Sequence, residues 1–486
     1  MTDAPVVLWF RNDLRLADHR ALKAAVASGR PIVPVFVLDD ISAGPWAAGG
    51  AARWWLHHSL EALAASIEER GGRLVFRRGE AAQVLASLAE DVGATACYFS
   101  RRYEPWAIRQ EKAVKDRAEK GGIEVRRFAG SLLMEPERVA TQAGDPYKVY
   151  TPFWRQIASV YKPERPLKAP ETLNGPKSQP RSDRLEDWSL LPRRPDWARG
   201  FADVWTPGEA GAVERLDDFL ENSVAGYTEE RNRPDLASTS RLSPHLAHGE
   251  ISPGQIWWRT ASARAAASSG SMAGPGDKGY ETFLKELVWR EFSAHLLFHF
   301  PTFPDEPFRA EFSRFPWSED EAGLVAWQRG NTGFPIVDAG LRELWATGWM
   351  HNRVRMIVAS FLIKDLLIPW QSGEAWFWDT LVDADLANNS ASWQWVAGSG
   401  ADAAPYFRIF NPTTQGQKFD PDGVYVRQWV PELAQLPDKF VHDPSAAPPE
   451  TLASAGVELG ATYPAPMVDH KVARVRALDA FERLKK

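Results

Sequence analysis

Residues 31–40 read PIVPVFVLDD, a short apolar run that ends in two carboxylates. A run of this length, rich in Val and Phe, predicts a buried β-strand. The stretch RWWLHHSLEALAASIEERGG at 53–72 has helical spacing and ends in a glycine pair, as helices often do. A strand followed by such a helix is the unit from which parallel sheets are built.

The same alternation continues toward both sides of this stretch. Further β-rich runs are VVLWF (6–10), RLVFRRG (73–79), ACYFSRRY (96–103) and EVRRF (124–128), with helical stretches between them. Five strands with intervening helices predict a doubly wound α/β domain, Rossmann-like or flavodoxin-like. We place this domain at residues 1–133.

The remainder of the chain differs in composition. Residues 163–207 hold eight prolines and little periodicity, which predicts a long connector draped over the surface, and we assign residues 134–208 to this linker. Helical periods dominate from residue 209, as in AVERLDDFLE, YETFLKELVWREFSAHLLFHF and MHNRVRMIVASFLIKDLL. We therefore expect an all-α domain over 209–486.

The composition restricts the possible classes of protein. The chain has 486 residues, of which 44% are apolar and 25% charged, as in packed globular proteins. Its single cysteine, Cys97, excludes an internal disulfide and a cysteine-ligated iron–sulfur cluster, and it suits the cytoplasm, where we expect the protein. The net charge of −6 argues against bulk polyanion binding but permits a local basic groove. No run reaches the ~18 apolar residues of a membrane span.

Two histidines have the spacing of some zinc-binding helices. His295 and His299 lie four residues apart in HLLFH. No glutamate follows the first histidine and no third ligand is near, so we assign both a core or capping role and expect no metal site.

Tryptophan is unusually frequent, with 22 residues in the chain. Core packing is the ordinary role of a tryptophan. The number also allows a second use, in stacking on flat ligands or in carrying electrons.

Two short stretches place polar and aromatic side chains on one helix face. Glu286, Trp289 and Arg290 in ELVWR are spaced i, i+3 and i+4. Asn352 and Met356 in HNRVRM are spaced i, i+4. Either set alone is explained by a salt-bridged helix or by packing, but each could also line a pocket.

A third stretch, TSRLSPHLAHGEISP (239–253), has the chemistry of a phosphate cradle. Thr239, Ser240 and Ser243 supply hydroxyls and backbone amides ahead of a helical stretch. A helix-capping loop is the alternative.

The fourth stretch is DADLANNSASWQW (383–395). If a helix begins at Asn389, then Asn389 and Trp393 share a face. The carboxylate of Asp383 needs a partner, and Arg355 is a candidate. Together the four stretches describe a pocket with hydroxyls for phosphate, an Asp/Arg pair, an amide and several indoles, which would fit a large planar nucleotide such as a flavin.

The chain resembles the DNA photolyase/cryptochrome family over nearly its whole length. The stretches that carry the resemblance are WFRNDLRLADHRAL (9–22), TSRLSPHLAHGEISP, ELVWREF (286–292), TGFPIVDAGLRELWATGWMHNRVRM (332–356), DADLANNSASWQW and GADAAPYFRIFNPTTQGQKFD (400–420). The resemblance implies an α/β domain, a linker and a helical domain that holds a U-shaped FAD.

The resemblance also implies roles for individual residues. FAD binding falls on Tyr227, Thr239, Ser240, Arg241, Leu242, Ser243, Arg290, Asn352, Arg355, Asp383, Asp385 and Asn389, with Asn389 facing flavin N5. A chain of tryptophans that carries an electron inward falls on Trp317, Trp370 and Trp393. Catalytic residues around the substrate and flavin are Glu286, Asn352, Met356 and Asn389, and DNA-binding residues are Arg231, Trp289, Arg353, Trp395 and Arg408.

Three features imply one branch of the family. Asn389 stands where plant-type cryptochromes usually carry an acid, which could pass a proton to N5 as an amide cannot. Asn352 and Met356 stand where (6-4) photolyases have histidines for acid catalysis. Trp289 and Trp395, which would clamp the flipped dimer, are both present, whereas cryptochromes often lose them.

The implied function is light-dependent DNA repair by a cyclobutane pyrimidine dimer photolyase, a carbon–carbon lyase. In such enzymes excited FADH⁻ donates an electron to the flipped-out dimer, which splits into two pyrimidines. RWWL (53–56) and HHSLEAL (57–63) resemble the class III branch. The alternative is a cryptochrome-type blue-light photoreceptor that binds FAD and signals through partner proteins.

A second, antenna chromophore is also implied. Methenyltetrahydrofolate is favoured over a deazaflavin, although Trp106 and Ala107 replace the better known folate-binding Asn-Glu pair. In class III proteins we expect folate elsewhere, against Trp54 or Trp55. The expected partner is UV-damaged DNA, and we expect a monomer with no obligate protein partner and no membrane association.

Overall fold

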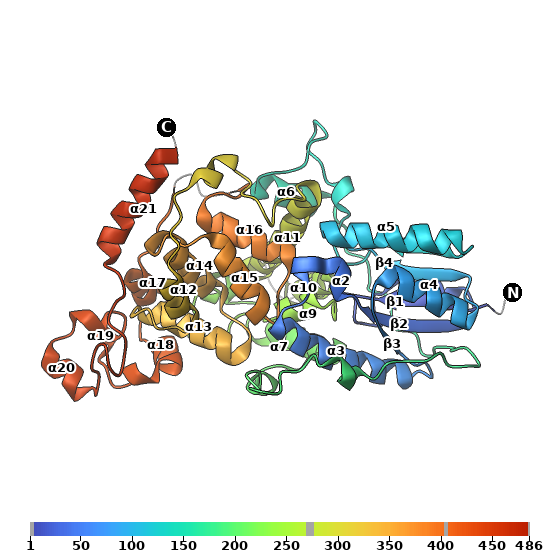
Figure 1. The fold of residues 1–486 in the computed structure, drawn as a ribbon, viewed down its shortest axis with the longest axis horizontal. Coiled ribbons are helices and arrows are strands. Elements are labelled where there is room, and N and C mark those ends of the chain that lie inside the picture. Colours follow the sequence, from blue (N-terminus) through green and yellow to red (C-terminus); the bar gives the residue numbers. More distant parts are fainter. Residues whose placement is uncertain (1–3, 269–276, 403–406, 485–486) are drawn as a thin grey trace. The chain divides into compact units, whose positions relative to one another are not determined.

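The protein is described here by a computed structural model that covers residues 4–268, 277–402 and 407–484 (Figure 1). The chain divides into two compact units, each made of three segments. Unit 1 comprises Met1–Ala225, Ser240–Pro301 and Val382–Ala387, and unit 2 comprises Gly226–Thr239, Thr302–Leu381 and Asn388–Lys486. The domain boundaries drawn from the sequence stay a prediction.

Unit 1 contains a five-stranded parallel sheet in the order β3-β2-β1-β4-β5. Its strands are β1 (Val6–Phe10), β2 (Ile32–Leu38), β3 (Val75–Arg78), β4 (Ala96–Ser100) and β5 (Glu124–Phe128). Each lies inside a run that the sequence analysis identified, so the expected doubly wound α/β fold is confirmed.

Alternate residues of the central strand β1 face two different hydrophobic cores. Val6, Leu8 and Phe10 enter the core that is packed by helices α1 (Arg20–Ala27) and α3 (Gly50–Glu68). Val7 and Trp9 enter the opposite core, which is packed by α4 (Ala81–Val92) and α5 (Pro105–Lys120). The helices therefore cover both faces of the sheet (Figure 1).

The proline-rich connector contributes to the first of these cores. Leu173, Leu185, Trp188 and Leu190 are buried there, and the ring of Trp188 lies 5.6 Å from that of Phe76. The expectation of a segment draped over the surface is therefore wrong for this part. Proline removes helical periodicity without preventing isolated apolar side chains from reaching a core.

The remaining helices of unit 1 surround these elements. They are α2 (Asp40–Ala43), η1 (Gly44–Trp46), η2 (Pro136–Arg138), α6 (Tyr150–Val160), η3 (Leu185–Trp188), η4 (Phe201–Asp203), α7 (Glu209–Asn222), α9 (Ser243–Ala247), α10 (Pro253–Ser268) and α11 (Asp277–His299).

The regular secondary structure described in unit 2 is helical, as expected, apart from one isolated bridge between Leu459 and Tyr463. Its helices are α8 (Tyr227–Glu230), η5 (Ala310–Arg314), α12 (Glu321–Gln328), α13 (Pro335–Thr347), α14 (Asn352–Ser360), η6 (Phe361–Asp365), α15 (Trp370–Thr380), α17 (Pro412–Phe419), α18 (Val424–Trp429), η7 (Pro431–Leu433), α19 (Asp438–Val441), η8 (Pro444–Ala446), α20 (Pro449–Ser454) and α21 (His470–Leu484). Helix α16 (Leu386–Ala397) crosses the division between the units.

Two helix boundaries differ from those expected. Helix α16 begins at Leu386, three residues before the start considered at Asn389, so Asn389 and Trp393 still share a face. The helix expected over MHNRVRMIVASFLIKDLL changes to a π-helical turn, η6, after Ser360. Among the described helices, none combines the length and apolar character that crossing a membrane requires.

Candidate functional site

Trp289 on α11 is stacked against an aromatic ring that the sequence analysis did not identify. The rings of Trp289 and Tyr150 lie 3.6 Å apart between centroids, at 8° to each other. The hydroxyl of Tyr150 donates a hydrogen bond of 2.5 Å to the carbonyl of Lys285, on the preceding turn of α11. Tyr150 therefore fixes the plane of Trp289. No local sequence signal indicated this, because Tyr150 lies in the predicted linker.

Arg290, on the same helix face as Glu286 and Trp289, is held by the protein backbone. Its Nη1 donates to the carbonyl of Ser131 (3.0 Å). The neighbouring Glu291 accepts the amide of Leu133 (2.8 Å), and burial raises the pKa of Glu291 to about 7. These contacts attach α11 to the loop after β5, and the FAD contact expected of Arg290 stays a prediction.

The expected phosphate cradle precedes the short helix α9. The N-cap residue of this helix, Leu242, makes no side-chain capping bond, and Pro244 follows Ser243 in its first turn. Thr239, Ser240 and Arg241 are partly exposed and Ser243 is exposed. The N-cap side chain therefore does not cap this helix, although a helix-capping loop was the alternative to a phosphate cradle. Phosphate binding stays a prediction.

The second half of the same motif forms a buried polar network. Glu250 accepts hydrogen bonds from Nε1 of Trp55 (3.0 Å) and from the amide of Gly208 (2.7 Å). Its other oxygen lies 2.5 Å from Nδ1 of His245. Trp55 is thus a fully buried structural residue, and Trp54 is packed against Phe201 with centroids 5.3 Å apart. Neither indole offers the open face that we expected for an antenna chromophore.

In unit 2, Trp393 on α16 packs directly on the backbone of α15. A Cβ atom added at Gly373 would lie 2.0 Å from Cη2 of Trp393, and Trp370 lies one helical turn before Gly373. The Trp393 ring is also 5.0 Å from Phe377 and 6.2 Å from Trp327, between centroids. Trp393 and Trp370 are both buried.

Trp317 lies near the start of the same helix. The amide of Ser318, its neighbour, donates 2.7 Å to the carbonyl of Leu367, three residues before Trp370. The structure therefore brings all three tryptophans of the expected electron chain to the N-terminal part of α15. It also adds the buried Trp327, whose Nε1 donates to the carbonyl of Val358 (3.0 Å) and which the sequence analysis missed.

Asn389 is buried and oriented by its neighbours. Its Nδ2 donates to the backbone carbonyl of Glu374 (3.0 Å), and the hydroxyl of Ser390 donates to the carboxyl of the same glutamate (2.5 Å). Burial, with a smaller contribution from Asp305, raises the pKa of Glu374 to about 8. The carboxyl beside Asn389 is therefore protonated at neutral pH.

Three arginines that we expect to bind DNA lie close enough to repel one another. Burial, and then the charges of Arg231 and Arg408, lower the pKa of Arg353. Two guanidinium nitrogens of Arg353 donate to Oδ1 of Asn232, at 3.2 and 2.6 Å, and its charge lies 4.5 Å above the ring of Phe419. This local positive cluster stands in a chain of net charge −6.

The other expected residues divide between the units. Asn352 is exposed and Met356 half-buried, one turn apart on α14, and Trp395 is half-buried on α16. Nε of Arg355 donates to the carbonyl of Met350 (2.7 Å). The remaining expected residues of unit 1 are Glu286, Asp383 and Asp385, and the buried Tyr227 belongs to unit 2. The pairing of Arg355 with Asp383 joins different units and stays a prediction.

Comparison with known proteins shows which family this chain resembles. Residues 6–171 match the family described as DNA photolyase, and residues 283–483 match the FAD binding domain of DNA photolyase. A deoxyribodipyrimidine photo-lyase of Agrobacterium fabrum is 53% identical over 483 residues, which is 99% of this chain and 98% of that protein. The chain belongs to the photolyase/cryptochrome family.

Other relatives of the family refine this assignment. The crystal structure of a bacterial class III photolyase from Agrobacterium tumefaciens superposes with a TM-score of 0.95 at 53% identity, covering 100% of this chain and 98% of that one. Cryptochrome-1 of Arabidopsis thaliana is 38% identical, over 98% of this chain and 70% of that protein. The chain is thus more similar to the class III photolyase than to the cryptochromes, which are more distant.

The donor groups of the described residues fit the FAD expected of this family. The indole nitrogen of Trp393 is buried and finds no hydrogen-bond acceptor among the described residues, as expected for a group left to face a ligand. Of the residues expected to bind FAD, those from Arg290 to Asn389 fall inside the matched FAD-binding range, whereas Tyr227 to Ser243 fall outside both matched ranges.

Proposed function

We propose that this chain is a class III cyclobutane pyrimidine dimer photolyase that repairs UV-damaged DNA in light. The observation that carries the proposal is the 53% identity, over 99% of the chain, to a deoxyribodipyrimidine photo-lyase. The neutral Asn389, the stacked Trp289 and the arginine cluster support it.

By the family resemblance, the residues that would receive the dimer are Glu286, Trp289, Asn352, Met356 and Trp395. A damaged base step leaves the duplex at a cost of about a few kcal/mol, and stacking on aromatic rings returns roughly 1–3 kcal/mol per base. Trp289, held in plane by Tyr150, would supply one such surface. Glu286 would accept hydrogen bonds from the pyrimidine edge.

Reduced FAD, when bound, supplies the photoexcitable electron donor of the reaction. Arg355, Asp383, Asp385 and Asn389 would hold its ring, and the segment 239–243 its phosphates. Asn389 carries no acidic proton, and its amide is oriented by Glu374. In this proposal Trp317, Trp370 and Trp393 conduct an electron inward to keep the cofactor reduced.

The arginine cluster would position the DNA backbone. Guanidinium groups bind phosphate oxygens, and the counterions released from DNA make such binding salt-dependent. Asn232 and Phe419 hold Arg353 in place from two sides. Because these contacts carry no sequence information, they would bind damaged and undamaged DNA alike.

Three further parts of the proposal concern the environment of the enzyme. We propose an antenna chromophore, methenyltetrahydrofolate in preference to a deazaflavin, at a place other than Trp54 and Trp55. We also propose a monomer without an obligate protein partner, located in the cytoplasm with the DNA.

The test of the function is a repair assay under anaerobic conditions. Reduced protein is mixed with a thymine-dimer oligonucleotide, illuminated with blue or near-UV light, and followed by recovery of base absorbance. Light-dependent recovery over many turnovers is expected. If FAD is bound and photoreducible but no recovery occurs, the photolyase proposal fails and a cryptochrome-type photoreceptor replaces it.

A further inference from the structure

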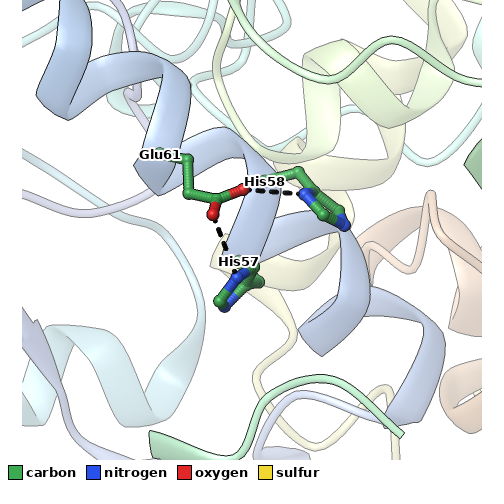
Figure 2. A group of neighbouring side chains, drawn as sticks. All are labelled: His57, His58 and Glu61. Atoms are coloured by element: carbon green, nitrogen blue, oxygen red, sulfur yellow. Dashed lines mark hydrogen bonds and ion pairs between the residues drawn. The ribbon is translucent and has the colours of Figure 1, made fainter. Parts of the chain in front are cut away.

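Three potential metal ligands come together on one face of helix α3, in unit 1. They are His57, His58 and Glu61, and the carboxylate of Glu61 lies between the two imidazole rings (Figure 2). Among the described residues, this is the one group of three or more histidine, cysteine or carboxylate side chains whose ligand atoms lie close enough together to hold a metal ion. Neither the expected FAD site nor the expected DNA-binding residues include it.

The donor atoms are close enough to share one ion. Nε2 of His57 lies 3.3 Å from one oxygen of Glu61, and Nδ1 of His58 lies 2.9 Å from the other. All three donor atoms lie within 4.8 Å of one another. Zinc–ligand bonds of ~2.1 Å place tetrahedral donors about 3.4 Å apart, so side-chain shifts of about 1.4 Å or less would close the set.

The scaffold holds the two imidazoles in place. His57 is buried, and the ring of Trp54 lies 4.6 Å from that of His58. The helix itself is anchored by buried residues such as Leu60 and Leu63. Only Glu61 is exposed. The two imidazoles are therefore held in position by packing, and the Glu61 carboxylate can shift toward a bound ion.

We propose that His57, His58 and Glu61 bind one divalent cation of the zinc class. Two imidazole nitrogens and one carboxylate oxygen form a donor set that suits Zn²⁺, Co²⁺ or Ni²⁺ better than Mg²⁺ or Ca²⁺, which prefer oxygen ligands alone. Three protein ligands and the exposed side of Glu61 leave room for water as a further ligand. The alternative is a carboxylate that is paired with two histidines and binds no metal ion.

The test is direct metal titration of the full-length protein loaded with FAD and stripped of metal by a chelator. Zn²⁺ is titrated by calorimetry and Co²⁺ by its visible absorption, with Mg²⁺ for comparison. One equivalent of Zn²⁺ and of Co²⁺ should bind, and Mg²⁺ should not compete. Glu61→Gln and His58→Ala should weaken Zn²⁺ binding by about 100-fold or more, because loss of even an outer partner of a metal ligand costs 10–100-fold.

Glu68→Gln is the matched control, because it removes the same charge from an exposed position on the same helix. It should leave the Zn²⁺ affinity unchanged. The proposal is wrong if the wild-type protein binds no equivalent of Zn²⁺ at micromolar concentrations, or if Glu61→Gln binds it as tightly as Glu68→Gln. Circular dichroism and the FAD spectrum confirm that each variant is folded, and the repair assay is not needed for the result.

Discussion

The side-chain amide of Asn389 donates a hydrogen bond of 3.0 Å to the backbone carbonyl of Glu374, whose own carboxyl accepts the hydroxyl of Ser390 at 2.5 Å. One residue of α15 thus orients two consecutive residues of α16. Glu374 was not among the residues that the sequence analysis singled out. Because its carboxyl is buried, a change in its protonation should change the stability of the protein.

Glu374→Gln should change how the stability of the protein depends on pH. The carboxyl has a pKa of about 8 in the folded protein against 4.5 in the unfolded chain. The stability it contributes is therefore fully present below pH 4.5 and is lost as the pH rises to 8. The variant, which cannot ionise, should match wild type at pH 4.5 and exceed it by about 2–5 kcal/mol at pH 8.5. Urea unfolding at both pH values measures this, and an equal difference at both would contradict it.

Gly373→Ala should displace the Trp393 indole. The added Cβ would lie 2.0 Å from the ring, and overpacking of a buried site costs about 1–3 kcal/mol. Thermal unfolding should show the loss, together with weaker FAD retention. Gly254→Ala, where the nearest atom would be 3.5 Å away, is the control and should be tolerated. If the two variants have the same thermal stability and FAD retention, the close contact between Gly373 and the Trp393 ring does not determine either property.

Trp393→Phe should slow the light-driven reduction of oxidised FAD by at least about tenfold, the change that corresponds to 1.4 kcal/mol. Repair by protein that is already reduced should be spared, because the proposed role of Trp393 is to supply electrons and not to bind the dimer. Flavin absorbance during illumination gives the first rate and the repair assay the second. Trp345→Phe, at an exposed tryptophan on α13, should change neither. Loss of both activities in a folded, FAD-loaded Trp393→Phe protein would exclude this division of roles.

Tyr150→Leu should weaken binding of dimer-containing DNA by about fivefold, since an aromatic pair contributes about 0.5–1.5 kcal/mol beyond its buried area. The reason is that Trp289 loses the ring against which it is stacked. Fluorescence anisotropy with damaged and undamaged oligonucleotides measures the effect. Tyr150→Phe keeps the ring and should bind the dimer nearly as wild type does. If leucine and phenylalanine behave alike, the stack does not support recognition.

Arg353→Ala should weaken binding to damaged and undamaged DNA by a similar factor. It should also lower the slope of log affinity against log salt by about one, the signature of one lost phosphate contact. Titrations at several salt concentrations give both values. Arg474→Ala, an exposed arginine on α21 and outside the cluster, should leave the slope unchanged. A loss confined to damaged DNA would instead place Arg353 in the dimer pocket.

Local patterns predicted the α/β sheet well, because each buried parallel strand is a short apolar run that needs no knowledge of distant residues. They failed for the connector, whose Trp188 reaches the core without any periodicity around it. Tyr150 and Glu374 were missed for the same reason. Each gains its importance from a contact with a distant residue, Trp289 or Asn389, and the spacing of neighbours along the chain does not encode such contacts.

The histidines at 57 and 58 show what residue spacing leaves open. His57 and Glu61 have i, i+4 spacing in HHSLE, just as His295 and His299 have in HLLFH. His295 is buried and its Nε2 accepts the amide of Tyr147 (3.0 Å), so the expected core role is confirmed there. The spacing of residues on a helix identifies candidate metal ligands. Their burial and hydrogen-bond partners then distinguish possible ligands from core residues.

The interleaved segments of the two units have a consequence for how the protein is made. The last piece of unit 1, Val382–Ala387, is synthesised only after about half of unit 2. Unit 1 cannot be complete until residue 387 has been made, and unit 2 cannot be complete until Asn388–Lys486 has followed, although domains usually fold in order of synthesis. The sheet can form early from residues 6–128, whereas the residues expected to surround the flavin must wait, which makes cofactor capture a late event in the life of the new chain.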